Sequence, residues 1–144
     1  MGDTEPRQTK DNDGGDVYRT KLDFHNRHAE WLADFASQKS RRKLKFHDDE
    51  LEAACRQLVQ KKRFVYMQGV KLDLNQCVPN HPHDGQDVVL YMPMTHPSAL
   101  LFRDPDIRFP TEEGTAIYIP AGQWHEVERN ESGIVRYTIA VLYR

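Results

Sequence analysis

Cysteine and long apolar segments are both scarce in this chain of 144 residues. Only two cysteines occur, Cys55 and Cys77, and neither belongs to a Cys-x-x-Cys pair or to a cluster of zinc-type ligands. A structural disulfide or a zinc knuckle is therefore not expected. No run approaches the roughly 20 apolar residues of a membrane-spanning helix, and the first residues lack the apolar stretch of a secretion signal. We expect a cytoplasmic protein with no membrane partner.

A strong net charge of either sign is also missing. The 20 basic and 22 acidic residues give a formal net charge of −2, so no overall attraction to nucleic acid or to an anionic membrane is expected. One basic cluster, KSRRKLK at residues 39–45, is interpreted as a solvated linker, with a contact to phosphate or protein as the alternative. No nucleic-acid partner is predicted.

The composition favours one domain. With 38% hydrophobic residues, the chain is long enough for one core and too short for two comfortable ones. Residues 1–16 contain no large apolar side chain after Met1, and we predict a disordered tail there. Residues 17–144 are predicted to form a single domain, with a helical part over 17–63 and a β-barrel with a metal site over 64–144.

Two helices are predicted in the first part. Phe24, His28, Trp31 and Phe35 recur at helical intervals and predict a helix over about 21–38.

The second helix has clear end signals. Asp48 is its expected N-cap, and Lys61 to Arg63 suit the negative C-terminal end. Its buried stripe is predicted to consist of Leu51, Ala54, Cys55 and Leu58.

After Arg63 the hydrophobic pattern changes from a helical to a strand-like period, interrupted by Pro, Gly, Asn and Asp. We predict about six or seven short strands, within the segments FVYMQGVKLDL, DVVLYM, SALLFR, GTAIYI, HEVER and VRYTIAVLY. No helical pattern separates them. Two helices followed by an antiparallel set of strands favour a mainly β fold, a closed or sandwich-like barrel with the helices packed on its outside.

Three of the seven histidines fall where strand-borne metal ligands are expected. On an extended chain His81 and His83 point to the same side, and His125 follows a Pro-Ala-Gly turn at the start of another strand. With a carboxylate from Asp84 or Asp87, such a set suits a redox-active Fe(II) site with open positions. The alternative is that His81 and His83 are exposed loop residues and that His125 caps a turn.

The remaining histidines are interpreted structurally. His25 and His28 fit a helix surface, His47 precedes a helix start that Asp48 caps, and His96 has no evident partner. Trp124 either shapes the substrate side of the site or packs in the core, and we favour the core.

The segment Glu112 to Ala140 resembles the C-terminal barrel strands of the Fe(II)/2-oxoglutarate-dependent oxygenases, which have a double-stranded β-helix fold. The resemblance rests on Gly114, Pro120, His125, Val127, Asn130-Glu131-Ser132 and Arg136, and the LLFRDPD segment at 100–106 adds to it. It covers about 40 residues well and implies a double-stranded β-helix (jelly-roll, cupin-like) barrel that uses Fe(II) and 2-oxoglutarate.

This resemblance also implies a role for Arg136. With Thr138 it matches the Arg-x-Ser/Thr element that holds the distal carboxylate of 2-oxoglutarate in these enzymes. A planar guanidinium grips a carboxylate with two parallel hydrogen bonds, and Thr138 lies on the same face of a strand. The alternative is a surface ion pair between Arg136 and Glu128 or Glu131.

A second resemblance is to small cupins, whose first motif is similar to His81-x-His83 with Asp87, and whose second is similar to Gly114 through His125. The chain departs from both patterns, because the first site has no His-x-Asp and Met94 stands where cupins have glycine.

We therefore predict a non-haem Fe(II)/2-oxoglutarate-dependent oxygenase. Its metal ligands are predicted to be His81, His83, Asp87 and His125, with Asp84 as an alternative to Asp87, and no further catalytic side chain is assigned. A metal-binding cupin that needs no 2-oxoglutarate (a dioxygenase, isomerase or lyase) and a non-enzymatic binding barrel are the alternatives. The expected substrate is a small molecule or a peptide, and a homodimer is an expected assembly.

Overall fold

The computed structural model describes residues 16–24, 27–103 and 106–144. The predicted disordered tail lies outside these residues except for Asp16, and so do His25 and the Asp104-Pro105 pair of the LLFRDPD segment.

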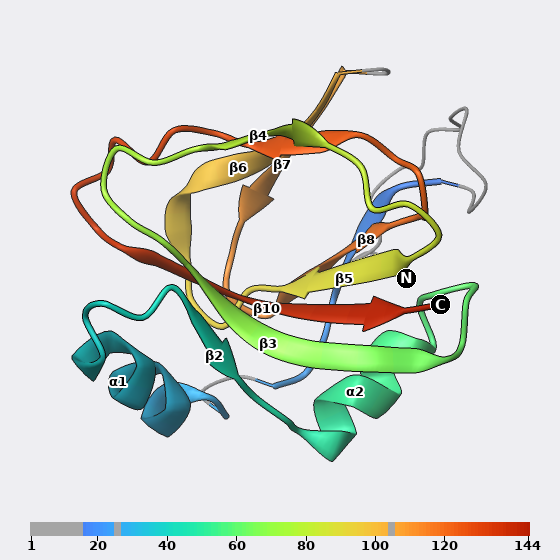
Figure 1. Ribbon diagram of the computed structural model, residues 1–144, viewed down its shortest axis with the longest axis horizontal. Coiled ribbons are helices and arrows are strands. Elements are labelled where there is room, and N and C mark those ends of the chain that lie inside the picture. The colour runs from blue at the N-terminus through green and yellow to red at the C-terminus, as the bar shows by residue number, and fades with distance from the viewer. Residues whose placement is uncertain (1–15, 25–26, 104–105) are drawn as a thin grey trace.

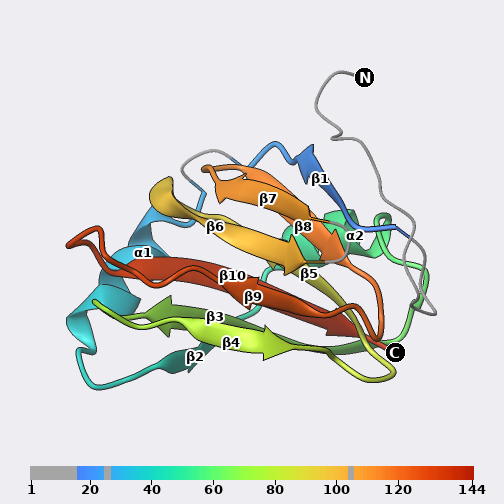
Figure 2. The same cartoon turned by 90° about the horizontal axis from the view of Figure 1, so that it is seen from above.

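Two antiparallel sheets face each other, and two helices lie on the far side of the larger one (Figure 1). The large sheet has the order β1 (Tyr18–Lys21), β8 (Thr115–Ile119), β5 (Asp87–Tyr91), β10 (Arg136–Tyr143), β3 (Phe64–Leu72) and β2 (Lys43–Lys45). The small sheet has the order β4 (Val78–His81), β9 (His125–Val127), β6 (His96–Arg103) and β7 (Asp106–Thr111). Figure 2 shows the small sheet stacked over the large one. The predicted mainly β fold with two N-terminal helices is confirmed.

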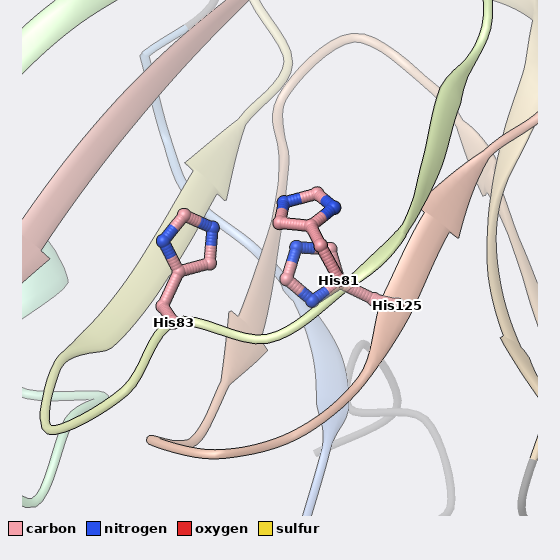
Figure 3. Close-up of side chains that lie close together, drawn as sticks. All are labelled: His81, His83 and His125. Atoms are coloured by element: carbon pink, nitrogen blue, oxygen red, sulfur yellow. The ribbon is translucent and has the colours of Figure 1, made fainter.

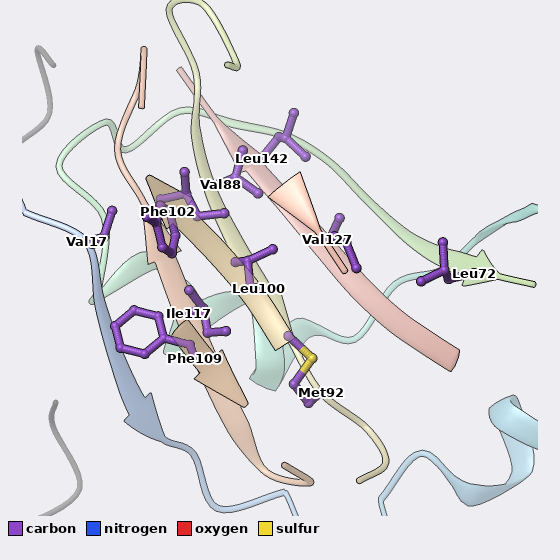
Figure 4. Packing of buried hydrophobic residues seen from close by; sticks show 12 residues of the cluster. Val17, Leu72, Val88, Met92, Leu100, Phe102, Phe109, Ile117, Val127 and Leu142 are labelled. Atoms are coloured by element: carbon purple, nitrogen blue, oxygen red, sulfur yellow. The ribbon is translucent and has the colours of Figure 1, made fainter. Parts of the chain in front are cut away.

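The large sheet is apolar on both faces. Its inner face and the small sheet enclose one buried cluster, which includes Val88 and Ile117 (Figure 4). Its outer face and the helices enclose a second cluster, which includes Val89 and Tyr118. Because neighbouring residues of one strand enter different clusters, segments such as DVVLYM and GTAIYI are continuously apolar rather than alternating.

The first helix is shorter than predicted. Helix α1 (Ala29–Ser37) begins well after residue 21, because Lys21 belongs to β1 and pairs with Thr115 of β8. Strand β1 depends on a partner far away in the sequence, so the local helical spacing did not reveal it.

The predicted N-cap of the second helix is confirmed. In α2 (Asp49–Arg56), the Asp48 carboxylate accepts hydrogen bonds from the amides of Glu50 and Leu51 at 3.0 and 3.1 Å. The helix ends at Arg56 and does not reach Lys61 to Arg63. Lys62 nevertheless donates from Nζ to the Arg56 carbonyl at 2.8 Å, so a positive charge does lie at this helix end.

All six segments predicted as strands contain one, while β1, β2, β4 and β7 were not predicted. Strand β2 lies in the basic cluster, and β4 and β7 each contain a proline, which weakens the sequence signal for a strand. Neither described helix has the length and apolarity needed to cross a lipid bilayer.

The Asp48 cap generates a prediction about acid stability. Burial alone raises the pKa of this carboxyl, but hydrogen bonds from Arg27, the Leu51 amide and His28 outweigh burial and lower the pKa from 3.8 to about 2. The stabilisation is therefore complete above pH 3.8 and is lost as the pH falls through about 2. We expect the unfolding free energy of Asp48→Asn, from urea titrations, to depend less on pH in this window than that of the native protein.

Asparagine is also a good N-cap, so the substitution removes the charge and keeps the cap. Asp49→Asn is the matched control, because the Asp49 side chain is exposed on the same turn. Parallel pH profiles for Asp48→Asn and the native protein would contradict the prediction.

Candidate metal centre

Three imidazoles come together on the small sheet. His81, His83 and His125 each offer a ring nitrogen, and these nitrogens all lie within 4.8 Å of one another (Figure 3). The ring centroids of His81 and His125 are 4.3 Å apart, and those of His83 and His125 are 5.2 Å apart in a stacked arrangement. The structure thus brings together the three histidines that the sequence singled out.

Strand pairing accounts for this arrangement. Strand β4 pairs with β9 so that His81 lies directly opposite His125. His83 follows two residues after His81, and its ring lies close to the rings of His81 and His125 (Figure 3). Residues from two sequence-distant segments therefore meet because their strands are hydrogen-bonded neighbours.

Hydrogen bonds hold two of the rings in one tautomer. The Nδ1 atom of His81 lies 2.7 Å from the Pro79 carbonyl oxygen, and Nδ1 of His125 lies 3.0 Å from that of Gln123. A carbonyl only accepts, so each Nδ1 carries the proton and donates. In a neutral ring Nε2 then carries the lone pair with which imidazole binds a metal.

Burial favours the neutral form of His83 and His125. His125 is 3% exposed, and burial is the main cause that lowers its pKa to about 3; the neighbouring His81 and His83 lower it further, and the bond to Gln123 opposes the shift. Burial and His81 also lower the pKa of His83. Neutral imidazoles suit Fe, Zn, Cu and Ni ions.

The structure does not bring Asp87 into this group. Asp87 is fully buried, and four donors surround its carboxylate: the amides of Gln60, Lys61 and Ala121 at 2.9 to 3.0 Å, and the Tyr118 hydroxyl at 3.1 Å. Strand alternation turns Asp87 toward the helices, because Val88 faces the barrel interior. Asp84 is exposed and also lies outside the group.

Arg136 faces the barrel interior. Ala140 and Leu142 follow it at even intervals on β10 and belong to the inner cluster, so Arg136 and Thr138 share that face. Arg136 is 5% exposed, and its Nε and Nη1 atoms have no hydrogen-bond partner among the described residues. Burial lowers the pKa of this guanidinium to about 10.

The alternative of a surface ion pair with Glu128 is wrong. Glu128 accepts two hydrogen bonds from Arg108, at 3.0 and 3.1 Å, on the outer side of the small sheet. Thr138 is buried on the same face as Arg136, and among the described residues its hydroxyl makes only a weak contact of 4.0 Å with the Met92 sulfur.

Ser98 is a polar residue of the interior that sequence reasoning missed. It is buried, and its Oγ has no hydrogen-bond partner among the described residues. Leu100 and Phe102, further along β6, belong to the inner cluster, while the pairing of β6 with β7 shifts register between His96 and Ala99, so alternation alone does not assign a side to Ser98. His96 Nε2, at the start of the same strand, donates to the Ile134 carbonyl at 2.9 Å, which places this end of β6 near the start of β10.

Trp124, for which core packing was favoured, is 53% exposed. It precedes His125 by one residue, and alternation turns it away from the barrel interior.

No protein-family model matches this chain, and no curated protein matches it. Solved structures do. The viral collagen prolyl hydroxylase vCPH from Paramecium Bursaria Chlorella virus-1, in its 2-oxoglutarate complex, has a TM-score of 0.69 and 11% identity over 88% of this chain and 94% of its own. HygX from Streptomyces hygroscopicus, with nickel and 2-oxoglutarate bound, has a TM-score of 0.62 and 13% identity over 88% and 81%.

The protein TT1209 from Thermus thermophilus is 22% identical over 70% of this chain and 80% of its own, with a TM-score of 0.50. Identities this low establish a shared fold and carry no activity across.

The buried His125 generates a prediction for the metal-free protein. Its folded-state pKa of about 3 lies below the ordinary 6.5, so below pH 6.5 the unfolded chain takes up a proton that the folded chain does not. Stability should therefore decrease as the pH falls from about 6.5 toward 3. In chelator-treated buffer we expect His125→Gln to lose less unfolding free energy over this range, as measured by urea titration.

His47→Gln is the control, since this histidine is exposed. Equal slopes for His125→Gln and the native protein would refute the idea that burial suppresses protonation of His125.

Proposed function

Because the chain has the cupin-like double-stranded β-helix fold, we propose that it is a non-haem oxygenase that uses Fe(II) and 2-oxoglutarate. His81, His83 and His125 are the metal ligands, and Arg136 holds the distal carboxylate of 2-oxoglutarate. The observation that carries the proposal is the buried guanidinium of Arg136, whose Nε and Nη1 atoms have no hydrogen-bond partner among the described residues, in the barrel that also holds the three clustered imidazoles.

The side chains fit both groups. Three imidazole nitrogens within 4.8 Å of one another suit one face of an iron ion and leave its other face open. A buried cation whose donors lack partners costs several kcal/mol. A carboxylate that accepts from Nε and Nη1 removes this cost with two charge-assisted hydrogen bonds.

Further donors support a carboxylate at this end of the barrel. The Thr138 hydroxyl shares the face of Arg136, and Ser98 Oγ lacks a partner among the described residues. Each hydroxyl has one O–H donor that a carboxylate can accept.

Each part of the chain has a physical task in this proposal. Iron and 2-oxoglutarate, when bound, supply oxidative decarboxylation coupled to oxidation of a substrate bond. The Gln123 and Pro79 carbonyls keep the His125 and His81 rings in the metal-binding tautomer. Leu100 and Val127 line the barrel between the sheets and exclude water. The substrate is expected to be a small molecule or a peptide.

A second function, a cupin that needs no 2-oxoglutarate, is favoured by one specific observation. Among the residues that the structure describes, the cluster contains three histidines and no carboxylate, whereas the 2-oxoglutarate enzymes that the sequence resembles use two histidines and a carboxylate. Under this alternative, Arg136 binds the carboxylate of a different substrate or serves only the fold.

The proposal predicts a visible charge-transfer band when Fe(II) and 2-oxoglutarate are added without oxygen. Arg136→Met should weaken 2-oxoglutarate binding about a hundredfold, because the loss of one partner of a buried charge pair costs about 2 to 5 kcal/mol. Fe(II) binding, which involves the histidines, should stay unchanged in this variant. Titration of the band measures the first quantity, and competition with a coloured chelator measures the second.

Arg108→Met is the matched control, since it makes the same chemical change on the exposed side of β7. Iron binding that His125→Ala abolishes, without any band at saturating 2-oxoglutarate, would refute the 2-oxoglutarate enzyme and leave the cupin. Absence of stoichiometric metal binding in the native protein would leave the non-enzymatic barrel.

A further inference from the structure

We propose that Asp87 is a positioning residue of the metal centre: it fixes the turn between β8 and β9, which is hydrogen-bonded to both His83 and His125, and it does not bind the metal. This inference rests on the proposed metal site. It replaces the ligand role that the sequence suggested with an indirect one.

The two oxygens of the Asp87 carboxylate have different partners. Oδ2 accepts from the amides of Gln60 and Lys61 at 2.9 and 3.0 Å and from the Tyr118 hydroxyl at 3.1 Å. Oδ1 accepts from the Ala121 amide at 2.9 Å. One oxygen is therefore held by the segment after α2 and by β8, while the other holds the turn between β8 and β9.

That turn contacts both parts of the histidine cluster. Gly122 donates its amide to the His83 carbonyl at 3.1 Å. The Gln123 carbonyl accepts from Nδ1 of His125 at 3.0 Å. Figure 3 shows the chain leaving β8, turning below the three rings and rising to His125. A displacement of this turn would move His83 and would release His125 from its tautomer.

The turn itself has little freedom to adjust. The Gln123 amide donates to the Pro120 carbonyl at 3.1 Å, and Gly122 has a φ of 82°. These are features of a type II turn, which requires a positive φ at its third residue and accepts proline at its second. Ala121 is the second residue, and its amide points out of the turn to Asp87.

Only a carboxylate satisfies this environment. All four groups around Asp87 are donors, so an asparagine amide would direct its own NH₂ group at another donor. Hydrogen bonds to a charged acceptor are about twice as strong as neutral ones. Partners that orient metal ligands from outside typically change metal affinity about 10- to 100-fold when they are replaced.

Three variants separate the two oxygens. Asp87→Asn disturbs both, Tyr118→Phe removes one donor from Oδ2, and Ala121→Pro removes the donor from Oδ1 at a position where the turn accepts proline. We expect Co(II) affinity to fall about 10- to 100-fold in Asp87→Asn and Ala121→Pro, with a changed visible Co(II) spectrum. The Co(II) affinity of Tyr118→Phe should stay within about threefold of that of the native protein, because Oδ1 of Asp87 still accepts from the Ala121 amide of the turn.

A metal-free measurement separates this inference from the proposed function. In the native apo-protein, ring ¹⁵N NMR should show His125 protonated at Nδ1. In Asp87→Asn and Ala121→Pro, the His125 ring signals should broaden or show a mixture of the two tautomers. If the native protein binds no Co(II) but the ring signals respond as expected, the metal site fails and the positioning role stands.

Native-like Co(II) affinity and ring signals in Ala121→Pro would overturn the positioning role. Equal losses in all three variants would also overturn it, because they would indicate general destabilisation. If Asp87→Asn fails to fold, the comparison of Ala121→Pro with Tyr118→Phe is sufficient to test the positioning role of Asp87.

Discussion

The large sheet is covered on both faces, and this constraint governs the polar groups of the protein. The small sheet covers the inner face and the helices cover the outer one. A polar side chain on the covered part of this sheet therefore loses water and must find partners within the protein or in a ligand. Asp87 has four donors, and Lys71 donates from Nζ to the Gln38 carbonyl at 3.0 Å beside the Phe35 ring. Arg136 differs, since two of its atoms lack partners among the described residues.

This contrast connects the fold to the proposed chemistry. A buried carboxylate with four donors is complete and serves the structure around it, whereas a buried guanidinium with open donors is suited to an anionic ligand. The histidine cluster, in contrast, is suited to a cation. Burial keeps His83 and His125 neutral by lowering their pKa values, and the lone pairs that remain are what a cation requires.

The sequence predicted the features that depend on local pattern. The strand-like runs after Arg63 became the barrel, and the period-two spacing of His81 and His83 placed both rings near one point. The N-cap at Asp48 was predicted because a cap is decided by residues within one turn. Strand β1 was not predicted, because its stability comes from β8, far along the chain.

By itself, then, the sequence determined the mainly β class, the three candidate histidines and the shared face of Arg136 and Thr138, since alternation and turn chemistry act over a few residues. The tertiary structure alone decided which histidines face one another, through the pairing of β4 with β9. It also decided that Asp87 lies outside the histidine cluster. A carboxylate near two histidines in sequence suggests a ligand, but only the folded backbone shows which amides surround it, and these take up both of its oxygens.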